Sequence, residues 1–283
     1  MKISNYKRFF YLILIYGFLV LVSIVIIYPF LWMLIASLKL SDRAMFNKSI
    51  FEIFKFKDIG FGNYSALVGL SSPPLLIMAL NSIVTAVVST LINIVVCFFA
   101  AYMLAKHKVV GGKYLFFFFI STMIIPQEVV AVPLYLVLIS LGLINSYQGI
   151  ILSLSAESLS IIILYRFFKE IPNEIIEASY IDGASELNLI FKIIFPLSWP
   201  AVMGAILIQF ITSWNAFIIP LITAIDENLY TLQIGMSYFS NTLFIDFRSI
   251  MALGSIITIP IILIYVLTQK RVIKGITAGS IKE

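Results

Sequence analysis

Residues 9–38 read FFYLILIYGFLVLVSIVIIYPFLWMLIASL, a run without a single lysine, arginine, aspartate or glutamate. Roughly 20 apolar residues cross the hydrocarbon core of a bilayer as a helix, so this run can span a membrane with some tilt. A cleaved signal peptide would have an apolar region of only about 7–15 residues before a small-residue cleavage site. The run therefore favours an uncleaved membrane anchor.

The composition of the whole chain extends this reading. Of its 283 residues, 61% are hydrophobic and 12% are charged, and the mean hydropathy is +1.06. An ordinary soluble domain has about 25% charged residues. We therefore predict an all-α integral membrane protein. The net charge of +5 fits the excess of basic residues on the cytoplasmic side of membrane proteins. No basic face with interleaved aromatics lies outside the apolar runs, so nucleic-acid binding is not expected.

The apolar runs predict six transmembrane helices in a single domain over residues 1–283. Proline and a carboxylate, at Pro126, Glu128 and Pro133, interrupt the third span, so we expect a helix to about Ile125 followed by a re-entrant or interfacial segment. The predicted spans are 10–37, 78–104, 114–138, 148–168, 200–223 and 247–269.

Lysine and arginine set the expected orientation. With six spans, both termini lie on one side, which carries thirteen of the 19 basic residues against six on the other. This bias predicts cytoplasmic termini, although the first outer loop is itself basic. Two outer segments, about 39–77 and 224–246, are long enough to contact another protein.

One cytoplasmic segment, residues 170–199, is charged and contains a turn. Pro172 suits the start of a helix, and Gly183 can adopt the positive φ of a sharp helix end. A second helix would place Leu187, Ile190, Phe191 and Ile194 on one apolar face, with Pro196 ending it. The pattern alone fits a helix–turn–helix coupling element and an ordinary amphipathic loop about equally well.

The residues at this turn resemble the EAA loop of ABC importer permeases. In that family the loop is a coupling helix that docks into a groove of a cytoplasmic ATPase subunit. Ser179 stands where the pattern prefers alanine, and Phe195 replaces the usual leucine before the proline. The matching residues are Glu177, Ala178, Ser179, Asp182, Gly183, Ala184 and Pro196.

Further stretches, in order, are similar to the permeases of carbohydrate ABC importers, in particular the smaller, six-span partner of the maltose type. The similarity covers the chain from about residue 60. These stretches are Asn81-Ser82, Ala100-Ala101-Tyr102, Pro126, Pro133-Leu134-Tyr135, Leu141-Gly142-Leu143-Ile144-Asn145, Ser213-Trp214-Asn215-Ala216-Phe217 and Lys274-Gly275-Ile276-Thr277-Ala278-Gly279.

The resemblance implies a type I (MetI-like) ABC importer permease in a bacterial cell membrane. It implies a homologous second permease subunit, two ATPase subunits that bind ATP and Mg, and an extracytoplasmic solute-binding protein. The chain itself is expected to be no enzyme: it has no catalytic constellation, no metal site and no cofactor. Gly111-Gly112-Lys113 does not complete a phosphate-binding loop, and the sole histidine, His107, is expected to be solvated.

Polar residues within the spans are candidates for the translocation path. A charge at the bilayer centre costs about 2.5–3.5 kcal/mol on insertion scales, so Glu157 should face protein or water. It either lines the path or has a structural role, in an ion pair or as a protonated carboxyl bonded to a flanking serine, Ser155, Ser158 or Ser160. Trp214 either stacks on a sugar or lies at the membrane interface. The other path candidates are Gln209, Asn215, Tyr135 and Asn145.

Two rival functions stay open at this stage. A secondary, ion-coupled transporter would need several ion-coordinating acids or paired broken helices in both halves of the chain. A membrane scaffold that transports nothing would not need an acidic turn in the cytoplasm. Within the ABC reading, a non-sugar solute such as a glycerol phosphate is the alternative substrate.

Overall fold

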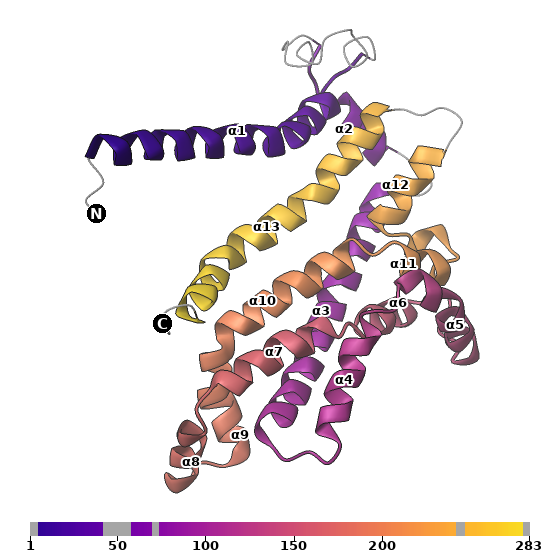
Figure 1. The fold of residues 1–283 in the computed structure, drawn as a ribbon. Helices are drawn as coiled ribbons and strands as arrows, with labels where there is room; N and C mark the ends of the chain where they lie inside the picture. The colour runs from indigo at the N-terminus through magenta and orange to yellow at the C-terminus, as the bar shows by residue number, and fades with distance from the viewer. Residues whose placement is uncertain (1–4, 42–57, 70–73, 242–246, 280–283) are drawn as a thin grey trace. The chain divides into compact units, whose positions relative to one another are not determined.

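The computed structural model describes residues 5–41, 58–69, 74–241 and 247–279, and for residues 5–8, 241 and 270–279 only the backbone is described. Apart from one isolated bridge between Lys39 and Ile59, the described residues contain no β-structure, which confirms the all-α fold. The helices are α1 (Asn5–Ser37), α2 (Gly62–Val68), α3 (Leu75–Lys106), α4 (Gly112–Thr122), α5 (Gln127–Ser140), α6 (Tyr147–Leu154), α7 (Leu159–Glu170), α8 (Asn173–Ile181), α9 (Glu186–Leu189), α10 (Phe195–Trp214), α11 (Ile218–Thr223), α12 (Leu232–Asn241) and α13 (Phe247–Gly279) (Figure 1).

Several of these helices are suited to a bilayer. Within the described ranges, four are long and apolar enough to cross one: Phe9–Ser37, Leu75–Lys106, Glu186–Trp214 and Phe247–Gln269. Two bent pairs, α4 with α5 and α6 with α7, pass the same test jointly, which gives six spans if each pair counts as one. The chain is therefore a multi-pass membrane protein.

The chain divides into two compact units. The first comprises residues 1–70 and 238–258. Its helix α1 exposes apolar side chains all around its circumference, from Phe9 to Leu34, as expected of a helix that faces lipid or another subunit. At the end of α1, the Asn63 side-chain amide donates to the backbone oxygens of Ser37 and Lys39, both at 2.7 Å. Parts of the two predicted outer segments lie outside the described residues. These parts are residues 42–57 and 70–73 of the first segment and residues 242–246 of the second.

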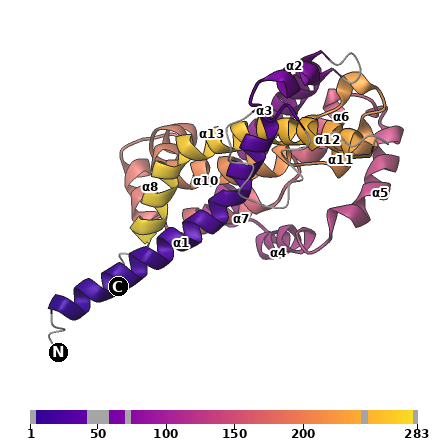
Figure 2. The ribbon, with the colours of Figure 1, turned by 90° about the horizontal axis from the view of Figure 1, so that it is seen from above.

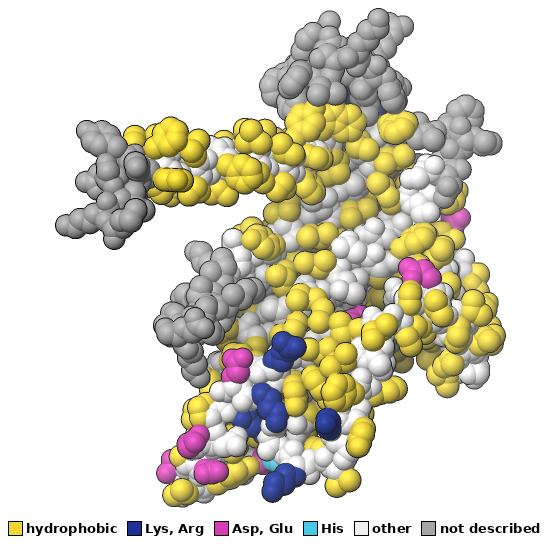
Figure 3. Space-filling view, viewed as in Figure 1, with side chains coloured by type: hydrophobic (Ala, Val, Ile, Leu, Met, Phe, Trp, Pro, Cys, Tyr) yellow, Lys and Arg dark blue, Asp and Glu magenta, His cyan; other side chains and the backbone are white. Residues whose placement is uncertain are grey.

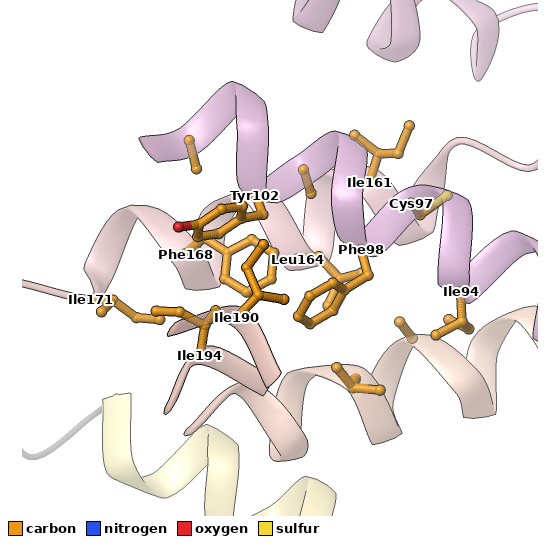
Figure 4. Close-up of a cluster of buried hydrophobic side chains, with 14 of the residues drawn as sticks. Ile94, Cys97, Phe98, Tyr102, Ile161, Leu164, Phe168, Ile171, Ile190 and Ile194 are labelled. Carbon is orange, nitrogen blue, oxygen red and sulfur yellow. The ribbon is translucent and has the colours of Figure 1, made fainter. Parts of the chain in front are cut away.

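The second unit comprises residues 71–237 and 259–283 and carries the predicted functional residues. The helices α3, α7 and α10 pack together along their lengths, with α8 and α9 at one end and α6 and α11 at the other (Figure 1). Their buried core includes Phe98 and Tyr102 of α3 and Leu164 and Phe168 of α7 (Figure 4). Val202 of α10 belongs to the same core. The expectation of one permease domain over residues 1–283 stays a prediction.

The predicted break in the third span is present. Helix α4 ends at Thr122, Pro126 precedes α5, and the two helices meet at 106° (Figure 2). Proline at this point cannot donate to a helical hydrogen bond, and the residue before it avoids the helical region. The polypeptide therefore turns sharply here, as the sequence indicated.

Candidate functional site

The predicted corner at Gly183 forms as expected. It lies within residues 170–199, the predicted coupling segment. Gly183 adopts φ +78°, the left-handed conformation that ends α8. The backbone N–H of Gly183 donates to the oxygen of Tyr180, and that of Ala184 donates to the oxygen of Ser179, both at 3.0 Å. This pair of bonds is a Schellman motif, in which a glycine satisfies the last carbonyl groups of a helix. The EAA residues thus form a helix end with a fixed geometry.

The outer face of this corner combines acids with apolar side chains. Glu177 and Asp182 are exposed, and acidic side chains gather at the end of the unit where α8 lies (Figure 3). Ile181 is 86% exposed and Leu187 is 64% exposed. Ala178 is also exposed, whereas Ser179 is buried and donates to the oxygen of Ile175 at 2.7 Å. Exposed apolar side chains rimmed by acids suit docking into a groove of another protein.

The prediction that Pro196 ends the second helix is wrong. Helix α9 runs through a π-helical turn, Ile190–Ile194, directly into α10, so that Glu186–Trp214 is one continuous helix. Pro196 occupies the first turn of α10 and is exposed. A π-helical turn is a common way to absorb an irregularity inside a helix, and here it precedes the residue that lacks an N–H. The helix that follows the corner is thereby joined to α10 without an intervening loop.

The coupling segment is also anchored in the core. Leu189, Ile190 and Ile194 are buried against α3 and α7 (Figure 4). Phe98 makes edge-to-face contacts with Phe168 and Phe195, with ring centroids 5.2 and 5.6 Å apart. The predicted apolar face therefore holds only in part, because Leu187 and Phe191 point outward while Ile190 and Ile194 point inward.

The C-terminal end of α3 binds the predicted coupling segment through Glu186. The Glu186 carboxylate accepts from Tyr102 at 2.9 Å and from Tyr180, and Nε2 of His107 lies 3.1 Å from it. The sequence led us to expect a solvated His107. The structure instead places it against Glu186, although its side chain stays partly exposed. Lys106 in addition donates to the backbone oxygen of Ile171 and to Asn173.

These bonds shift the acidities of the groups that share them. Burial alone would raise the pKa of Glu186, but the hydrogen bonds from Tyr180, Tyr102 and His107 together bring its pKa below the ordinary value. The bond to this carboxylate in turn raises the pKa of Tyr180. Glu186 is thus held as a carboxylate, the form that accepts all these donors.

The path candidate Glu157 lies in a break of the predicted fourth span. Helix α6 ends at Leu154 and α7 begins at Leu159, at an angle of 41°. One of the alternatives was a bond from a flanking serine to the carboxyl group. Ser155 instead donates to Ile151 and Ser158 bonds to Thr122, while the backbone N–H of Leu159 donates to the Glu157 carboxylate at 3.4 Å. Glu157 itself is half-buried.

Two side-chain amides hold the oxygens released by this break. The Asn93 amide of α3 donates to the oxygens of Ser155 and Glu157, at 2.9 and 2.8 Å, and Gln209 of α10 donates to the oxygen of Leu154 at 2.9 Å. Both amide side chains are buried. Asn93 was missed by sequence reasoning, and the only available signal was an amide in the middle of an apolar helix.

The other path candidates lie at the opposite end of the unit. Trp214 is buried and stacks on Phe210, while Asn215 is exposed at the end of α10. Tyr135 is half-buried on α5. Asn145 has φ +55°, and its side-chain oxygen accepts from the backbone nitrogens of Ile225 and Asp226 at 3.0 and 2.9 Å. Gln209 donates to Ser213, the neighbour of Trp214, at 3.0 Å and so lies close to this group. The role of all these candidates in transport stays a prediction.

A family model described as the binding-protein-dependent transport system inner membrane component matches residues 93–278. The chain belongs to this family. Among its relatives, the probable ABC transporter permease YurM of Bacillus subtilis is 31% identical, over 94% of this chain and 87% of the relative. The trehalose/maltose transport system permease MalG of Thermococcus litoralis is also 31% identical, over 93% and 94%.

A solved structure supports the same architecture. A chain of a bacterial ABC transporter involved in the import of the acidic polysaccharide alginate superposes with a TM-score of 0.81 at 22% identity, covering 95% of this chain and 99% of that one. The permease fold inferred from the sequence is therefore confirmed, and the chain is a membrane-embedded transport subunit.

Proposed function

We propose that this permease is one half of the translocation path of an ATP-driven bacterial carbohydrate importer. The observation that carries the proposal is the corner at Gly183, an exposed helix end that is followed by α9, which continues into the membrane helix α10. Through such a corner, a soluble ATPase, the motor of the importer, can push on the membrane spans. The corner itself then needs no catalytic residue. The carbohydrate class is supported by relatives named for trehalose/maltose and arabinooligosaccharide transport.

The implied complex contains four kinds of component. A homologous second permease completes the path, two ATPase subunits bind ATP and Mg below the corner, and a solute-binding protein delivers substrate from outside. Both termini face the cytoplasm, in keeping with thirteen basic residues on that side. The closed ATPase dimer binds one of two conformations of the spans better than the other. Its closure therefore shifts the permease toward that conformation.

Purification of the tagged chain from its native membrane tests this proposal. We expect an ATPase subunit and a second permease to copurify, and we expect the complex in vesicles to accumulate labelled oligosaccharide only with ATP and the binding protein. Accumulation by the chain alone, driven by an ion gradient, would overturn the proposal and favour a secondary transporter. Retention of glycerol phosphate in place of sugars by the binding protein would overturn the carbohydrate class.

A further inference from the structure

The carboxylate of Glu186 joins three separate segments at the cytoplasmic end of the second unit. It sits in the first turn of α9, just after the corner. Its donors come from α8, through Tyr180, and from the end of α3, through Tyr102 and from His107 just beyond it. The helix before the corner, α8, and the helix after it, α9, are thus both bonded to α3 through the Glu186 carboxylate.

Hydrogen bonds to an ionised carboxylate are the stronger kind, because donor and charge attract each other. The donors here are also positioned by packing. Tyr102 is fully buried and makes edge-to-face contacts with Phe168 and His107, with ring centroids 5.9 and 5.5 Å apart. Tyr102 therefore cannot follow Glu186 by changing its own position, and a displaced Glu186 must either drag α3 or break the bond.

Among the described helices that meet at this junction, α3 reaches the opposite end of the unit as a regular α-helix, without a π-helical turn or a proline along its length. It runs from Leu75 to Lys106, while α6 and α7 are interrupted, and the path through α10 includes a π-helical turn and two prolines, Pro196 and Pro200. At its other end, Asn81 donates to the oxygens of Asn228 and Tyr230, both at 2.8 Å. Midway, Asn93 holds the α6–α7 break.

From this geometry we propose that Glu186 is a positioning residue for transport, which passes displacement of the corner to α3. Helix α3 then moves as a rigid rod that carries the α6–α7 break and the outer segment around Tyr230 with it. The proposal rests on the function proposed above and adds the route by which the motor's push reaches the membrane. Its parts are Glu186, the two tyrosines and His107.

The test measures solute transported per ATP hydrolysed by the complete complex in vesicles. Tyr102→Phe removes one hydroxyl and keeps the buried ring, so we expect uptake to fall more than hydrolysis and the ratio to drop by about tenfold, in line with the loss of a hydrogen bond to a charged group. Glu186→Ala should lower the ratio further than Glu186→Gln, which keeps one acceptor oxygen. The double variant Tyr102→Phe with Glu186→Gln should be no worse than the more severe single variant, because both act on one junction.

The matched control is Tyr114→Phe, at an 81% exposed tyrosine on α4. The proposal is overturned if Tyr102→Phe leaves the ratio at the wild-type value, or if Glu186→Gln and Glu186→Ala lower ATPase copurification equally, which would make Glu186 a docking charge. Should Glu186→Ala fail to insert, the Tyr102→Phe result still decides. Failure of the proposed function looks different, because the wild-type complex would then show no ATP-dependent uptake.

Discussion

The side-chain amide of Asn93 lies 2.8 Å from the backbone oxygen of Glu157 and donates to it across the bundle. A second bond from the same nitrogen reaches Ser155. The break between α6 and α7 is thus stabilised by a helix that is distant in sequence, as unpaired backbone at membrane depth requires.

Replacing Asn93 by leucine should destabilise the protein through the released oxygens of Ser155 and Glu157. An unpaired buried acceptor costs about 1–3 kcal/mol, so we expect a measurable fall in the unfolding midpoint in detergent and a loss of uptake. Ser23→Ala is the control, because its hydroxyl is exposed and donates to Leu19 within its own helix. An unchanged midpoint in Asn93→Leu would show that the break does not depend on this amide.

Glu157→Gln should leave substrate affinity and uptake rate near the wild-type values. The bonds that secure the break use the backbone oxygen of Glu157, which the substitution keeps. Uptake assays over a range of substrate concentration measure both quantities. A marked loss of affinity would instead assign the carboxylate to the translocation path.

Gly183→Pro should leave the protein inserted in the membrane and abolish transport. Proline cannot adopt φ +78° and lacks the N–H that donates to Tyr180. Gly183→Ala should be milder, since nothing lies within 4 Å of an added Cβ and the left-handed conformation costs about 1–2 kcal/mol. Gly204→Ala, on α10 with equal space and no positive φ, is the control. Normal uptake by the proline variant would contradict the coupling role of the corner.

Ile181→Asp should weaken binding of the ATPase subunit by about tenfold, because an apolar anchor at the centre of an interface belongs to the minority of residues that contribute more than about 1 kcal/mol. The side chain is 86% exposed, so its replacement removes no internal packing. Val110→Asp, at a fully exposed residue in the α3–α4 loop, controls for the added charge. Copurification at graded salt and detergent concentrations gives the comparison, and equal binding by both variants would place the docking face elsewhere.

The features that the sequence predicted are local ones. Gly183 ends α8 because a left-handed residue is needed within a few positions of the helix end, and Pro126 breaks the third span by its own missing N–H. Both effects act on neighbouring residues, so a linear pattern is enough to find them.

The features that the sequence did not predict depend on distant partners. The sequence around Leu154 and Leu159 did not lead us to predict the α6–α7 break. The amides that bond to the backbone oxygens at this break, those of Asn93 and Gln209, come from α3 and α10. Likewise, the residues next to Pro196 do not decide whether a helix ends there or starts its first turn there. In this chain the helix continues, and Ile190 and Ile194 before it pack against α3 and α7.

The π-helical turn at Ile190–Ile194 has a consequence for insertions and deletions. A π-turn accommodates one residue more than an α-turn, and each residue of an α-helix advances about 1.5 Å and 100°. Deleting one residue there would restore regular winding and leave the segment before it in nearly the same orientation, whereas deleting one residue from the regular part of α10 would rotate that segment by about 100° around the helix axis. The π-helical turn is therefore the place along this helix where the loss of one residue would least change the orientation of the acidic end formed by α8 and α9.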